Sequence, residues 1–127
     1  MRMGKKEVLL AAILVASLAT AGSRVALAKD AAVTVTGEVI DSACYIKMGA
    51  KGADHEECAT KCAKAGIPLA ILEEKTNHVW MVASDKDAES GNEKLLPFVA
   101  KKVTVTGKTF EKGGQKLLAI SSVKGAS

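Results

Sequence analysis

The sequence predicts a mainly β domain: a small five-stranded antiparallel barrel of the OB type, with a short cysteine-bearing helix inserted after the first strand. Three observations predict it. Five short segments have the apolar pattern of strands, one helical segment follows the first of them, and a polar connection separates the third strand from the fourth. A β-sandwich fragment is the alternative architecture.

The first predicted strand covers residues 32–40 and contains a motif that occurs twice. VTVTG stands at residues 33–37 and again at residues 103–107. Valine alternating with threonine is the period-2 pattern of a strand with one buried face. Five residues are too few to indicate a duplication, so we expect two strands with the same packing requirement.

The helical segment follows at residues 55–65. Asp54 is the candidate N-cap, with Glu57 three residues further on as in a capping box. Gly66 stands at the expected C′ position, and Pro68 prevents continuation of the helix.

The remaining elements complete one domain. Residues 68–74 and 78–84 are two apolar strands around the turn KTN, which predicts a hairpin. A polar connection follows, with a helical turn expected near Leu95. The last two strands, residues 101–112 and 115–124, are joined at Gly113 and Gly114, where a positive φ is favourable.

The N-terminus has the pattern of a secretory signal peptide covering residues 1–28. A basic head is followed by an apolar run and then by the A-x-A pattern at Ala26 and Ala28, which places the cleavage before Lys29. A retained membrane anchor is the alternative, but the apolar run has 14 residues, whereas a spanning helix needs about 20. The sequence therefore predicts a periplasmic or secreted domain of residues 29–127.

Charge excludes some partners. The formal net charge is +4, and the signal segment carries +3 of it, from Arg2, Lys5, Lys6 and Arg24 against Glu7. The remaining domain carries +1, which is too little to bind a phosphate backbone by charge, so we expect no nucleic-acid partner. After cleavage we also expect no membrane association. No particular oligomeric state is indicated.

The cysteines lie in one segment and predict a metal site. His55, Cys58 and Cys62 are spaced i, i+3 and i+7, so on a helix they point within about 60° of one another. Cys44 follows the first strand on a loop with two glycines that can fold back over this stripe. Three sulfurs and one nitrogen suit a tetrahedral Cys₃His site for Zn²⁺ or Cu⁺. Met48 and Met81 could add thioether sulfur for copper.

Two alternatives compete with the metal. In an oxidising compartment Cys44 could pair with Cys58 or Cys62, and closing the 19-residue loop from Cys44 to Cys62 would contribute about 3 kcal/mol. The chain would then be a disulfide-stapled domain binding a protein or small ligand. The other alternative is a thiol–disulfide redox protein using Cys58 or Cys62. No C-x-x-C-H is present, so covalent haem is not expected, and no catalytic motif indicates an enzyme.

Three further residues have side chains that could contribute to a site. Asp41 could accept a hydrogen bond from a ligating histidine, although an aspartate at a strand end more often caps a turn. His78 is expected as an exposed turn residue. Trp80 is expected to fill the core.

These segments resemble a group of small exported bacterial proteins of uncharacterised function. The resemblance rests on GEVIDSACYI (residues 37–46), on H-x-x-C-A-x-x-C (residues 55–62) and on AGIPLAIL (residues 65–72). With Trp80 and the late KKVTVTG it extends over most of the predicted mature chain. It implies an OB-like fold, an extracytoplasmic location, and Cys44, His55, Cys58 and Cys62 as motif positions.

Overall fold

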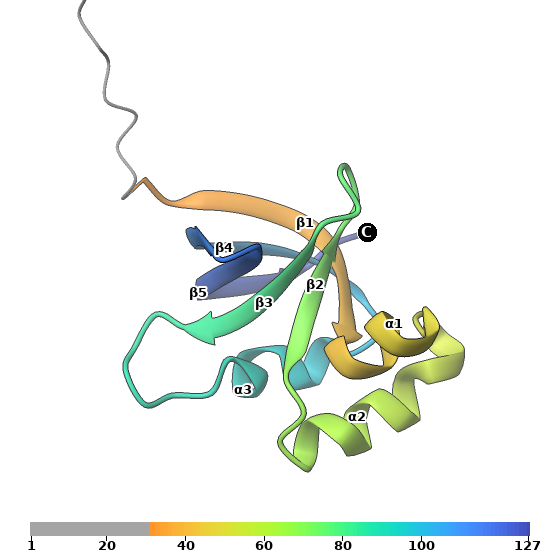
Figure 1. Cartoon of the computed structure of the whole chain (residues 1–127). Coiled ribbons are helices and arrows are strands. Elements are labelled where there is room, and N and C mark those ends of the chain that lie inside the picture. The colour runs from red at the N-terminus through yellow and green to blue at the C-terminus, as the bar shows by residue number, and fades with distance from the viewer. Residues whose placement is uncertain (1–30) are drawn as a thin grey trace, which may run out of the picture.

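The computed structural model describes residues 31–127, and its strands wrap into one closed sheet with helices at one end (Figure 1). The elements, in chain order, are β1 (Val33–Asp41), α1 (Ser42–Met48), η1 (Ala53–His55), α2 (Glu56–Lys64), β2 (Leu69–Glu73), β3 (Val79–Ser84), α3 (Gly91–Leu95), η2 (Leu96–Phe98), β4 (Lys102–Lys112) and β5 (Gln115–Gly125). The segment predicted as a signal peptide lies outside the described residues. Within them, no helix is long and apolar enough to cross a membrane.

The five strands form a mixed sheet and not an antiparallel one. The strand order is β1-β2-β3-β5-β4, and β4 pairs back to β1. Four of the pairings are antiparallel, but β3 and β5 run parallel, with Met81 opposite Leu117 and Ser84 opposite Ile120. The prediction of a mainly β, five-stranded domain is confirmed, and the prediction of a wholly antiparallel arrangement is wrong. The long connection through α3 makes the parallel pairing possible.

The two VTVTG motifs are partners of each other. They pair antiparallel, with Val33 opposite Gly107 and Gly37 opposite Val103. Each glycine lies against a neighbouring strand: a Cβ on Gly37 would collide with the Leu72 carbonyl oxygen, and one on Gly107 with that of Ala119. The motif therefore supplies buried valines from one face and a glycine where another backbone approaches closely.

The core fills the inside of the sheet and continues beneath α2 and α3. Its buried members include Val39, Leu69, Ile71, Val105, Leu118 and Ile120 from the strands, Ala59 and Ala63 from α2, and Leu95 from α3. Trp80 is buried as predicted, and its Nε1 donates a hydrogen bond to Glu73 Oε2 at 3.1 Å. The predicted β2–β3 hairpin and the helical turn near Leu95 are confirmed.

The segment after β1 is a helix, where the sequence had predicted a loop. Asp41 caps α1 by accepting a hydrogen bond from the backbone N–H of Cys44 at 3.0 Å. Gly49, with φ of 69°, ends the helix, and its N–H donates to the Tyr45 carbonyl at 2.7 Å. Cys44 therefore lies on a helix and not on the predicted loop.

The second helix starts later than predicted. A 3₁₀ turn covers Ala53–His55, and α2 begins at Glu56 with His55 at the N-cap, so Asp54 does not cap it. The predicted end is confirmed. Gly66, with φ of 98°, follows the last turn, and the N–H groups of Gly66 and Ile67 donate to the carbonyls of Ala63 and Cys62.

Candidate metal centre

The candidate centre lies where β1 ends and α1 meets α2 (Figure 1). Asp41 is the last residue of β1, and Cys44 lies in the first turn of α1, three residues later. The opposite side is α2, which carries Cys58 and Cys62, with His55 immediately before it. Two short helices thus present their polar side chains toward each other.

A first set of donors comprises Cys44, His55 and Cys58. One ligand atom from each lies within 4.8 Å of the others. In a tetrahedral zinc site with metal–sulfur bonds near 2.3 Å and metal–nitrogen bonds near 2.0 Å, ligand atoms lie about 3.5–3.8 Å apart. Small rotamer changes would therefore bring these three atoms to coordination distance.

A second set comprises Asp41, Cys44 and Cys62. A carboxylate oxygen and the two sulfurs also lie within 4.8 Å of one another. Cys44 belongs to both sets. Among the described residues, the four ligands predicted from the sequence therefore do not form one mutually close group: Cys62 is brought to Asp41, while His55 is brought to Cys58.

Both sets contain a buried polar atom with no hydrogen-bond partner. In the part of the chain that the structure describes, only Asp41 Oδ2 and His55 Nε2 are buried side-chain nitrogen or oxygen atoms without one. Asp41 is 1% exposed. The thiols of Cys44 and Cys62 interact with its carboxylate, but Oδ2 itself has no hydrogen-bond partner. Buried atoms in this condition are rare and call for an explanation such as a bound ion.

The three cysteines are free thiols with unequal exposure. Cys58 is exposed, whereas Cys44 and Cys62 are half-buried. Cys58 therefore lies on the solvent side of the cluster, and Asp41 forms its buried side.

The carboxylate of Asp41 controls the protonation of the neighbouring thiols. Hydrogen bonding to Asp41, followed by burial and the charge of Asp41, raises the pKa of Cys62 to about 11. Burial, followed by the same carboxylate, raises the pKa of Cys44. Burial alone would raise the pKa of Asp41, but hydrogen bonds from the Cys44 N–H, the two thiols and the Ala43 N–H together lower it. In the metal-free protein the carboxylate is ionised and these two thiols are protonated at neutral pH.

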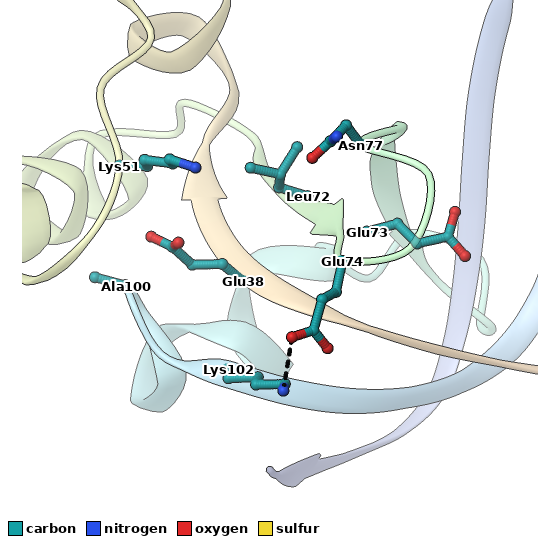
Figure 2. Close-up of a pocket in the computed structure, with 8 residues that line it drawn as sticks. All are labelled: Glu38, Lys51, Leu72, Glu73, Glu74, Asn77, Ala100 and Lys102. Atoms are coloured by element: carbon teal, nitrogen blue, oxygen red, sulfur yellow. Dashed lines mark hydrogen bonds and ion pairs between the residues drawn. The ribbon is translucent and has the colours of Figure 1, made fainter. Parts of the chain in front are cut away.

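The loop that delivers His55 is anchored on β1. Glu38 Oε1 accepts a hydrogen bond from the N–H of Gly52, and the Gly52 carbonyl accepts one from the N–H of His55 at 3.0 Å. Glu38 also lines a surface pocket of about 380 Å³ (Figure 2). Its other charged members include Lys51 and an ion pair between Lys102 Nζ and Glu74 Oε1 at 2.9 Å. No cysteine lines this pocket. Its connection to the centre is the carboxylate of Glu38, which holds the loop that precedes His55.

Of the other candidates, Asp41 belongs to the centre, whereas His78, Met48 and Met81 lie outside both donor sets. Asp41 caps α1, which confirms the expectation that an aspartate at a strand end caps a turn. Its position beside the thiols of Cys44 and Cys62 was not predicted. The D-x-x-C spacing at the junction of strand and helix could have indicated it. His78 is half-exposed beside Glu73, with 3.8 Å between Nδ1 and Oε2. Met48 is exposed at the end of α1, and Met81 packs near Ile40 and Leu72.

Comparison of the chain with protein-family models, with curated proteins and with solved structures finds no match. The chemistry of the centre therefore has to be inferred from its donors, their spacing and their burial.

Proposed function

We propose that the chain is a small exported metal-binding module of the OB type, in which Cys44, His55, Cys58 and Cys62 hold zinc or copper. One observation carries the proposal. Donor atoms of Cys44, His55 and Cys58 lie within 4.8 Å of one another, and His55 Nε2 is buried without a partner. Thiolate and imidazole are ligands that zinc and copper both accept.

The scaffold and the location are parts of the same proposal. A five-stranded sheet closed in the order β1-β2-β3-β5-β4 supports the OB assignment. Export is supported by the basic, apolar and small-residue order of residues 1–28. Neither affects the donor set, because its residues all lie between Asp41 and Cys62.

Exposure favours a metal that can be exchanged over one that is only structural. Cys58 is exposed, so a thiol of a partner protein or small molecule could reach a metal from that side and replace one ligand at a time. Cys44 and His55, which are less exposed than Cys58, would keep the metal attached while this happens.

The test is metal content in His55→Ala, with His78→Ala as the matched control. His55→Ala removes a ligand and should weaken metal binding at least about tenfold, because even partners of a ligand are worth that much. His78 lies outside both donor sets, so His78→Ala should bind metal as the wild type does. Equal metal content in wild type and His55→Ala, in reduced protein loaded with zinc or Cu⁺, would reject the proposal.

A second candidate is a disulfide-stapled binding domain. It is favoured by the position of Cys44, whose sulfur lies within 4.8 Å of that of Cys58 and of that of Cys62, so modest adjustment would bring either pair to the ~2.05 Å bond. This candidate predicts one remaining thiol, on Cys58 or Cys62, and no metal in protein taken from the compartment to which we propose it is exported. Three titratable thiols there would exclude it.

A further inference from the structure

Five donors at the centre separate into two sets of three. Cys44, His55 and Cys58 form one, and Asp41, Cys44 and Cys62 form the other. The sets share Cys44 and differ in burial: the first contains the exposed Cys58 and the second the buried Asp41. A single ion bound to Cys44, His55 and Cys58 would leave the carboxylate of Asp41 and the sulfur of Cys62 without a metal.

The unpartnered atoms provide an independent sign. In the described part of the chain there are two of them, and each set contains one: His55 Nε2 in the first and Asp41 Oδ2 in the second. One ion in the first set, if bound through Nε2, would explain His55 and would leave Asp41 Oδ2 as it is. Two ions would satisfy both atoms.

We propose that the centre holds two divalent ions of the zinc class, bridged by the thiolate of Cys44. The first ion is bound by Cys44, His55 and Cys58, and the second by Cys44, Cys62 and Asp41. This inference rests on the proposed function, and it adds Asp41 as a ligand and a second binding position. When the ions bind, metal–sulfur bonds replace the three S–H bonds, and the three protons leave to water.

Charge supports two divalent ions. Three thiolates and one carboxylate carry four negative charges, and the imidazole is neutral. With one divalent ion in the first set, Cys62 stays a protonated thiol, and the thiolates of Cys44 and Cys58 and the carboxylate of Asp41 leave one negative charge uncompensated. Asp41 is 1% exposed, and uncompensated charge in such a place is strongly unfavourable. Two divalent ions balance the four charges. Each ion has three protein ligands here, so water or a partner's ligand completes its tetrahedron.

The experiment counts zinc ions per chain by native mass spectrometry. The full-length chain is purified reduced and without oxygen, loaded with Zn²⁺ and freed of excess metal. We expect two ions in the wild type, one in Asp41→Asn and in Cys62→Ser, and one in His55→Ala. Asp41→Asn is the decisive variant, because asparagine caps a helix as well as aspartate and keeps an oxygen for the Cys44 N–H. Glu57→Gln, on the exposed face of α2, is the control and should keep two ions.

The results distinguish a failure of the two-ion centre from a failure of the proposed metal-binding function. One ion in the wild type, with no loss in Asp41→Asn, would overturn the two-ion centre and leave the proposed function standing. Two ions in Asp41→Asn would remove Asp41 from the ligands and overturn the assignment. No zinc in the wild type would overturn the two-ion centre, and if the protein bound no Cu⁺ either, the proposed function would be contradicted as well. Circular dichroism of each metal-free variant checks that the count does not reflect misfolding.

Discussion

Two polar centres lie beside helix α2, one at Asn92 near its C-terminal end and one at Asp41 and His55. They differ in how many of their polar atoms have a hydrogen-bond partner. At the C-terminal end, the buried side chain of Asn92 accepts a hydrogen bond from the Leu69 N–H at 2.8 Å. It donates to the carbonyls of Ile67 at 2.8 Å and Ala63 at 3.2 Å. Every polar atom of Asn92 therefore has a partner within the chain, and its role is to fasten α3 to the α2–β2 connection.

The centre at Asp41 and His55 also contains buried polar atoms, but it is incomplete. One carboxylate oxygen and one imidazole nitrogen lack partners, and three thiols surround them. The comparison with Asn92 shows that this fold provides hydrogen-bond partners for a buried polar side chain whose role is structural. A group that the fold leaves unsatisfied, in a cluster of soft donors, is better explained by a ligand.

The largest predicted effect is the stabilisation of the cluster by metal. Zinc at about a thousand times its dissociation constant should raise the free energy of unfolding by about 4 kcal/mol, because the unfolded chain lacks the site. Urea unfolding with zinc and with a chelator measures this. Cys44→Ser should abolish the difference, since Cys44 belongs to both donor sets. Identical unfolding curves for the wild type under both conditions would contradict the account of the cluster.

The next effect distinguishes the satisfied centre from the open one. Asn92→Ala removes three hydrogen bonds and leaves the buried Leu69 N–H unpaired. We expect it to lower the free energy of unfolding by about 3 kcal/mol. The loss should be the same with and without zinc, and zinc binding should remain. If the free energy of unfolding fell only in the presence of metal, Asn92 would be part of the metal centre, and the distinction between the two centres would be wrong.

A third prediction concerns thiol reactivity in the metal-free, reduced protein. Because Asp41 and burial raise the pKa of Cys62 to about 11, little thiolate exists at pH 8. Alkylation of Cys62 should be at least about tenfold slower than that of the exposed Cys58, and its rate should keep rising as the pH approaches 11. Asp41→Asn should speed it. Mass mapping of alkylated peptides over time measures both rates. Equal rates for the two cysteines would count against the influence assigned to Asp41.

The smallest effect concerns the loop that positions His55. Glu38→Gln replaces the charged acceptor of the Gly52 N–H with a neutral one. The hydrogen bond should weaken without disappearing, and zinc affinity should fall by about 1 kcal/mol, or roughly fivefold. Competition with a zinc-binding dye gives the affinity. Glu74→Gln, which alters the same pocket without touching the loop, is the matched control.

Much of the strand pattern was predictable, because each strand has its own alternating sequence. The twin VTVTG segments and the turn at Gly113 and Gly114 are local signals, and the structure contains both. The parallel pairing of β3 with β5 was missed. No local pattern specifies it, since it depends on where the connection through α3 carries the chain.

The centre was predicted in its residues and less well in its geometry. The spacing of His55, Cys58 and Cys62 does place them beside Cys44, but in two sets and not in one. The glycines after Cys44 predict a loop where the structure has helix α1, and Asp41 and Gly49 are the two caps of this helix. The approach of Asp41 to Cys62 joins the end of a strand to the next-but-one helix, and only tertiary structure produces it.

Metal binding in the cell is tested most directly by the mass of the protein, measured natively and after denaturation, when it is purified from the compartment to which we propose it is exported. If the three cysteines hold metal, the native mass will include bound metal and the denatured mass will correspond to three reduced cysteines. A native mass without metal, together with a denatured mass lighter by two hydrogen atoms, would show a disulfide in place of the metal and would contradict the account.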